Sequence, residues 1–187
     1  QYVVDQGNVT NWDHMEKIFN YGFTQINANL EEDGVLISES SNITKGNREK
    51  MIELMFETFN VNSYYSLNQG VLNVIGSGLS SGFSIDIGYS LTEIVPVSEY
   101  HAIEYSILHE RFAGRNLMNS LNRLLTDQSI NLNAEPFSRE KFLSEQLSTS
   151  CYFAFNYGHE MKKYKSSSEP FKKFTINGYD KYDFKES

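Results

Sequence analysis

Two segments in the first third of the chain place apolar residues on one face, at the spacing of an amphipathic helix. The first segment follows Asn11 and the second follows Asn47, and Asn is a favourable residue for the N-cap of a helix. We therefore predict a helix after each of these residues. The faces predicted to be buried consist of Trp12, Met15, Ile18 and Phe19 in the first helix and of Met51, Leu54, Met55 and Phe59 in the second.

Short apolar runs at residues 35–38 and 64–67 follow these helices and predict interior strands. A short helix is predicted directly after the second run, at residues 69–75. The next segment, GSGLSSG at residues 76–82, contains three glycines and three serines and predicts a flexible link. The chain is therefore expected to change its organisation at this link.

Beyond the link the apolar residues recur with a period of two. Runs at 83–87 and 91–97 flank a tight turn and predict a β-hairpin, and a third run surrounds 100–103. Helical spacing returns at 112–125 and again from Ser138. Strands and helices on both sides of the link predict an α/β fold with a mixed sheet in each part. Four apolar residues are expected to be buried: Trp12, Phe56, Leu72 and Leu121.

Composition narrows the class of protein further. The 187 residues suffice for one ordinary domain or two small ones, and 40% of them are hydrophobic, which favours a packed core. The net charge of −8 argues against nucleic-acid binding, and no apolar run approaches the roughly 18 residues of a membrane span. Cys151 is the only cysteine, so no disulfide forms within the chain, and its apolar neighbours predict a buried, inert thiol.

Six segments of the chain resemble actin and actin-related proteins. They are GNVTNWDHMEKIF, NREKMIELMFETFN, QGVLNVIGSG, FSIDIGYSLTEIVPV, FAGRNLMNSLNRLLT and CYFAFNYGHEM. The resemblance covers nearly the whole chain and implies the central portion of a two-lobed α/β fold with mixed sheets flanked by helices. It implies that residues 1–76 belong to the first large lobe (subdomain 1) and residues 77–112 to the sheet and hairpin of the second lobe (subdomain 3). Residues 113–187 would form an incomplete helical and peripheral part, similar to subdomain 4.

The hairpin SIDIGYS resembles the second phosphate loop of the actin, heat-shock protein and sugar-kinase superfamily, DxGxG followed by Thr. The match implies that Asp86 holds a metal-bound water, while the turn from Gly88 points backbone N–H groups at phosphate and Thr92 follows it. Ser90 stands where the second glycine is usual, and its Cβ is expected to make glycine-like backbone angles costly. No direct protein ligand to a metal is expected.

Two further segments belong to the implied nucleotide site. Gln69 matches the residue that orients the attacking water, but Glu93 stands where the family has the partner His. A carboxylate repels a polyphosphate and lacks the proton relay of an imidazole, so we expect hydrolysis to be absent or very slow. Gly114, followed by Arg115, matches the helix start against which purine and ribose lie. The implied cofactor is ATP or ADP with magnesium.

Three functions remain open. The first is a divergent actin-related protein that is a structural subunit of a larger assembly. The second is a filament-forming actin that binds and hydrolyses ATP, and the third is a sugar or metabolite kinase of the same superfamily. Glu93 and Ser90 favour the first. Its expected partners are protein subunits of a complex or filament, and its expected location is cytoplasmic and cytoskeletal, with the cilium or nucleus as alternatives.

Overall fold

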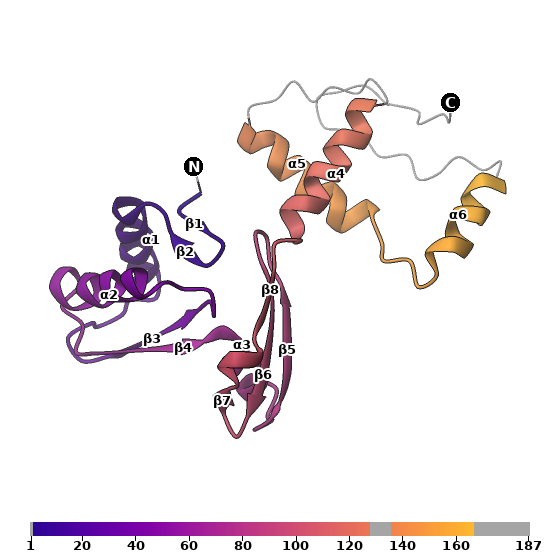
Figure 1. Ribbon diagram of the computed structural model, residues 1–187. Coiled ribbons are helices and arrows are strands. Elements are labelled where there is room, and N and C mark those ends of the chain that lie inside the picture. The colour runs from indigo at the N-terminus through magenta and orange to yellow at the C-terminus, as the bar shows by residue number, and fades with distance from the viewer. Residues whose placement is uncertain (1, 128–135, 167–187) are drawn as a thin grey trace. The chain divides into compact units, whose positions relative to one another are not determined.

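The computed structural model describes residues 2–127 and 136–166 (Figure 1). It divides into two compact units, Gln1–Asn116 and Leu117–Ser187. Helices and several sheets occur together, which confirms the predicted α/β class. The lobe boundaries predicted at residues 76 and 112 concern the complete fold and stay predictions.

The first unit opens with a small hairpin and a long helix. Strands β1 (Val4–Asp5) and β2 (Asn8–Val9) pair antiparallel around a tight turn in which Gln6 has a φ of 48° and Gly7 a φ of 80°. Helix α1 (Trp12–Gln25) follows. Its predicted cap is confirmed, because the Asn11 side chain accepts a hydrogen bond of 3.0 Å from the His14 N–H.

Strands β3 (Gly34–Glu39) and β4 (Ser63–Asn68) are parallel and in register along their whole length. Helix α2 (Lys45–Glu53) connects them and continues into the π-helical turn η1 (Leu54–Thr58). The predicted cap of α2 is wrong: Thr44 is the N-cap, and Asn47 lies in the first turn. The Asn47 side-chain oxygen instead accepts a hydrogen bond of 2.7 Å from the Val9 N–H. This tertiary contact occupies the oxygen that a helix cap would use.

The first hydrophobic cluster forms where α1 and α2 pack on β3 and β4. Met51, Met55 and Val61 are buried, and Trp12, Phe19, Phe59 and Tyr64 pack around them partly exposed. The prediction that Phe56 is buried is wrong, because it is 44% exposed. Its neighbour Met55 takes the inward position, and an adjacent helical residue must point elsewhere. Trp12, Leu72 and Leu121 are only partly buried, and Ile18 is exposed.

The remainder of the first unit is an antiparallel sheet with one helix on it. Helix α3 (Gln69–Gly76) begins directly after β4, as predicted. Strand β6 (Thr92–Ser98) pairs with β5 (Gly82–Ile87), which confirms the hairpin. Two short strands also pair with β6, β7 (His101–Ala102) and β8 (Leu108–Glu110), with the 3-10 turn η2 (Glu104–Ser106) between them. A second hydrophobic cluster lies between α3 and the sheet and contains Val71, Val74, Val95 and Val97.

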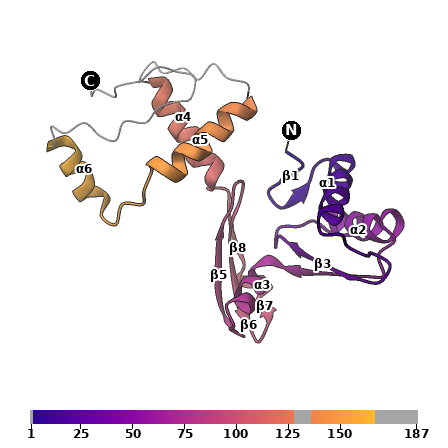
Figure 2. The same cartoon turned by 180° about the vertical axis from the view of Figure 1, so that it is seen from behind.

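The described C-terminal part is helical and is shown from salmon to yellow in Figure 1 and from behind in Figure 2. Its helices are α4 (Gly114–Asp127), α5 (Pro136–Ser150) and α6 (Tyr157–Ser166). Helix α5 begins two residues before the predicted Ser138, because proline is favourable in the first helical position. The prediction of a buried thiol is also wrong, because Cys151 is exposed and lies beyond the end of α5. The hairpin that the sequence suggests at Asn177 lies outside the described residues.

Among residues 2–127 and 136–166, no helix is both long and apolar enough to cross a membrane.

Candidate functional site

The candidate site lies at the carboxyl ends of the parallel strands β3 and β4. Ligand sites of open α/β sheets are found at this edge, outside the carboxyl ends of the strands. The residues that follow the two strands are Ser40 and Ser41 after β3 and Gln69 after β4. Hydrogen bonds connect them to Asp86 on β5 and Glu93 on β6. Two of the predicted site regions, at Gln69 and at the hairpin, therefore meet here.

Three titratable residues form one row across the antiparallel sheet. Asp86 is the register partner of Glu93, and Glu93 is the register partner of His109 on β8. Directly opposite residues of antiparallel strands project from the same face. Two carboxylates therefore stand side by side with an imidazole beyond them. The sheet face is acidic at the position where the resemblance implies a phosphate.

Gln69 and Asp86, the two predicted catalytic residues, are in contact. The Gln69 amide Nε2 donates a hydrogen bond to Asp86 Oδ2. Gln69 is the first residue of α3, whose start is fixed by the Asn68 side chain accepting from the Gly70 N–H at 2.8 Å. The contact holds the Gln69 side chain against β5. Its role in orienting a water stays a prediction.

Glu93 is buried, with 7% of its surface exposed, and one of its oxygens accepts several hydrogen bonds. Oε1 accepts from the Ser40 hydroxyl at 2.9 Å, from the Ser41 N–H at 2.9 Å, and from the Ser41 hydroxyl. A buried carboxylate is costly unless such donors surround it. These bonds stabilise Glu93 on the sheet and tie the loop after β3 to it.

His109 adjoins this carboxylate. Its Nε2 lies 2.8 Å from Ser41 Oγ and 3.6 Å from Glu93 Oε1. The trio is not a hydrolase triad, because a triad acid bonds to Nδ1 whereas Glu93 and Ser41 both face Nε2. Sequence reasoning did not predict Ser41 or His109 as site residues. Strand β8 is only three residues long, and no residue in it is buried, so no apolar period could have indicated it.

The hairpin turn from Gly88 to Ser90 is held by hydrogen bonds to the start of α4 and to the β1–β2 turn. The Gly88 carbonyl accepts from the Gly114 N–H at 3.0 Å, and the Tyr89 carbonyl accepts from the Arg115 N–H at 2.8 Å. Ser90 Oγ accepts from the Gln6 N–H at 3.0 Å. The hairpin turn and the start of α4 therefore lie in contact. The predicted backbone penalty at Ser90 is wrong, because its φ is not positive.

Close packing explains why glycine occupies two positions of this region. A Cβ on Gly88 would lie 3.0 Å from the Leu91 carbonyl oxygen, and one on Gly114 would lie 3.3 Å from the Gly88 carbonyl oxygen. Thr92, the last hairpin residue of the predicted site, donates its hydroxyl to the Phe112 carbonyl at 2.7 Å. The turn therefore owes its shape to contacts within the chain.

Arg115 forms an ion pair with Asp5 and stacks against two tyrosine rings. Its Nη2 lies 2.7 Å from Asp5 Oδ1, and its guanidinium lies 5.1 Å from the centre of the Tyr89 ring and 5.9 Å from that of Tyr2. The two rings are 5.0 Å apart. The hydrogen bond to Asp5 raises the pKa of Arg115 above its ordinary value. This side chain joins β1 to the hairpin turn.

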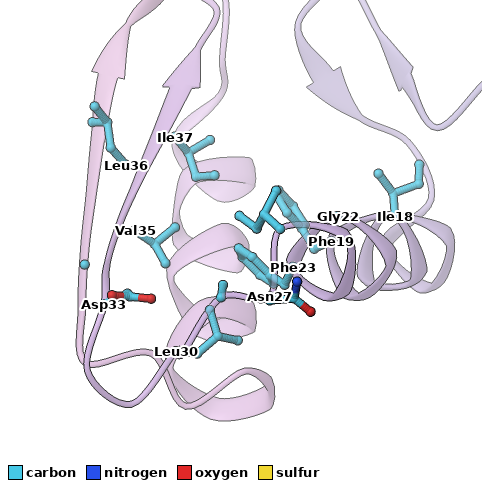
Figure 3. A pocket seen from close by; sticks show the side chains of 13 residues that line it. Ile18, Phe19, Gly22, Phe23, Asn27, Leu30, Asp33, Val35, Leu36 and Ile37 are labelled. Carbon is cyan, nitrogen blue, oxygen red and sulfur yellow. The ribbon is translucent and has the colours of Figure 1, made fainter.

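The first unit contains a polar cavity and an apolar one. The polar cavity, of about 610 Å³, adjoins the site and is lined by Ser40, Ser41, Asn68 and His109, among others. The apolar cavity, of about 700 Å³, lies between α1 and β3, where Figure 3 shows Phe23, Leu30 and Val35. No predicted site residue lines the apolar cavity. Across the described part of the chain, no group of three or more His, Cys, Asp and Glu side chains could hold a metal ion.

Comparison with known protein families agrees with the resemblance seen in the sequence. A family model described as Actin matches residues 1–175 of the chain.

Proposed function

The chain belongs to the actin family, and from this premise we propose that it is a divergent member that serves as a structural subunit of a larger protein assembly. We propose further that ATP hydrolysis is lost or very slow. The observation that carries this proposal is the buried carboxylate of Glu93, held by Ser40 and Ser41. Its surroundings suit a structural role better than a catalytic one.

The chemistry of Glu93 argues against hydrolysis. Its Oε1 already accepts hydrogen bonds from Ser40 and Ser41, so it is poorly placed to accept a proton from an attacking water. Asp86 stands directly opposite it. Two adjacent carboxylates repel a third anionic group, and a triphosphate brings several negative charges. Gln69, bonded to Asp86, then lacks a partner that could relay the proton.

Charge also weakens nucleotide binding. Two arginines near the site are paired, Arg115 with Asp5 at 2.7 Å and Arg48 with Glu39 at 2.6 Å. The carboxylate partly neutralises each guanidinium and weakens its attraction for phosphate. If ATP or ADP binds with magnesium, we propose that it does so weakly. The residues that would hold it are Asp86, Gly88, Ser90, Thr92, Gly114 and Arg115.

Exposed apolar surface supports membership of an assembly. Phe83, Ile85 and Ile87 are all more than 60% exposed and alternate along one face of β5. In the second unit, Phe153 and Phe155 are fully exposed. Contiguous apolar patches of this kind mark protein interaction surfaces. We propose protein subunits as the partners and the cytoskeleton as the compartment, with the cilium or nucleus as alternatives.

The second candidate, a filament-forming actin that binds ATP, is favoured by one observation. The Gly114 N–H bonds to the Gly88 carbonyl at 3.0 Å, so the hairpin and the helix start that would hold phosphate and ribose lie together. This candidate predicts ATP-dependent sedimentation of the purified protein. The kinase candidate predicts transfer of phosphate from ATP to a sugar.

Phosphate release by the full-length protein, alone and with its co-purified partners, tests the proposal. We expect turnover far below that of a polymerising actin measured in parallel. The variant Glu93→His should increase turnover only if ATP binds, which equilibrium binding of a fluorescent ATP analogue determines independently. Turnover of the unaltered protein equal to that of the actin control would overturn the proposal.

A further inference from the structure

The first unit contains two hydrophobic clusters joined by one strand. The first cluster centres on Met55 and the second on Val95. Strand β4 runs from one to the other, because its Tyr64 packs on the first and its Leu67 on the second. Helix α3 continues directly from this strand. The β4–α3 connection is therefore the covalent link between two separately packed cores.

Polar contacts supply further connections between the two cores. The loop after β3 meets the sheet through Ser40 and Ser41, which bond to Glu93 and His109. A second set, at the hairpin turn, consists of the Gln6 bond to Ser90 and the Asp5–Arg115 pair with its stacked tyrosines. Hydrogen bonds require specific distances and angles, whereas the hydrophobic effect is non-directional. Losing one of these bonds should therefore release a specific segment.

We propose that Glu93, Ser40, Ser41 and His109 form a polar lock that fixes the position of one core against the other. Glu93 is the centre of the lock, because its buried Oε1 accepts from both serines. Without that acceptor, the Ser40 hydroxyl and the Ser41 N–H lose this partner, and an unpaired donor in a partly buried position costs free energy. The Ser41 hydroxyl keeps its contact with His109 Nε2. The loop then leaves the sheet, and the cores rotate about the β4–α3 connection.

The lock also extends to the β1–β2 turn. Ser40 Oγ accepts from the Asn42 N–H at 3.1 Å, and the Asn42 amide donates to the Gln6 carbonyl at 2.9 Å. Gly7 packs so closely on this loop that a Cβ there would lie 2.5 Å from Ser40 Cβ. Movement of Ser40 therefore displaces the turn that carries Gln6. Through Gln6, the lock is connected to Ser90 in the hairpin turn.

Hydrogen exchange on the full protein tests the lock. The variants are Glu93→Leu, which removes both acceptor oxygens but keeps an aliphatic side chain, and Ser41→Ala. The matched control is Glu110→Leu, the same change at an exposed residue of the adjacent strand. We expect each lock variant to raise the exchange rate of the amides at 40–43 about tenfold, with little change around Met55 and Val95. The double variant should add little to either single change.

Two results would overturn the lock. One is unchanged exchange at 40–43 in Glu93→Leu, and the other is an equal increase throughout both cores, which would mean general destabilisation. Spin labels at the exposed residues Glu57 and Leu79, in a Cys151→Ser background, give an independent measurement. Glu93→Leu should broaden the distance distribution between them, and an unchanged distribution would also contradict the lock. Neither measurement involves ATP, so the lock and the loss of hydrolysis can fail separately.

Discussion

Asp86 and Glu93 lie directly opposite each other on β5 and β6, so two carboxylates share one face of the sheet. Like charges in this arrangement destabilise an antiparallel pair. Different donors surround each of them: Gln69 donates to Asp86, and Ser40 and Ser41 donate to Glu93. These donors explain how the sheet tolerates the pair. They also make the pair sensitive to small changes in its neighbours.

Replacing Glu93 by alanine should destabilise the protein by about 1–3 kcal/mol, because the Ser40 hydroxyl and the Ser41 N–H lose their acceptor. Chemical denaturation followed by circular dichroism measures the free energy of unfolding. Glu110→Ala, at an exposed residue of β8, is the control and should change it by less than about 0.5 kcal/mol. Equal effects of the two substitutions would contradict the structural importance of Glu93.

Gly7→Ala should be among the more destabilising single substitutions, by about 2 kcal/mol or more. Gly7 has a φ of 80°, and an added Cβ would lie 2.5 Å from Ser40 Cβ. Gly46 provides the opposite case, because it lies in α2 and a Cβ added there would have no neighbouring atom within 4 Å. Gly46→Ala should stabilise the helix by about 0.5–1 kcal/mol. In thermal unfolding, the melting temperature of Gly7→Ala should be lower than that of the unaltered protein, and that of Gly46→Ala should be higher. An unchanged melting temperature of Gly7→Ala would be inconsistent with this packing.

Arg115→Lys should not be a conservative change. Lysine keeps the charge but loses the planar group that stacks against Tyr89 and Tyr2. Because Asp5 and Arg115 are each more than a third exposed, we expect a loss of only about 0.5–1.5 kcal/mol. A double-mutant cycle with Asp5→Asn measures the coupling, which should decrease at high salt. Zero coupling at low salt would mean that the pair contributes nothing to the position of β1.

Stability should fall in alkaline solution partly because of Tyr64. Burial raises the pKa of Tyr64 above its ordinary value of 10.0, and the Glu39 carboxylate acts in the same direction. The unfolded chain therefore loses this proton at a lower pH than the folded protein, and the free energy of unfolding decreases as pH rises. Urea denaturation between about pH 9 and 11 should show a shallower decrease for Tyr64→Phe. Tyr21→Phe, at an exposed residue, is the control and should leave the slope unchanged.

Local patterns in the sequence predicted much of the fold. The helical spacing of Met51 and Met55 indicated the buried face of α2, and Asn11 was the cap of α1 as expected. The alternation around Gly88 indicated the hairpin. Each of these features depends on residues only a few positions apart. Periodicity and capping residues indicate such features directly, because each feature depends on the residues of a single helix or hairpin.

The tertiary structure decided which elements meet and which of several suitable side chains makes each contact. Thr44 rather than Asn47 caps α2, because Val9 uses the Asn47 side chain. Ser41 and His109 lie 68 positions apart in the sequence. They meet in the site because β8 pairs with β6 and the loop after β3 contacts the sheet. Such contacts depend on strand register and on the packing of distant segments. No local period in the sequence encodes them, so the family and the elements could be predicted whereas the polar contacts around Glu93 required the assembled fold.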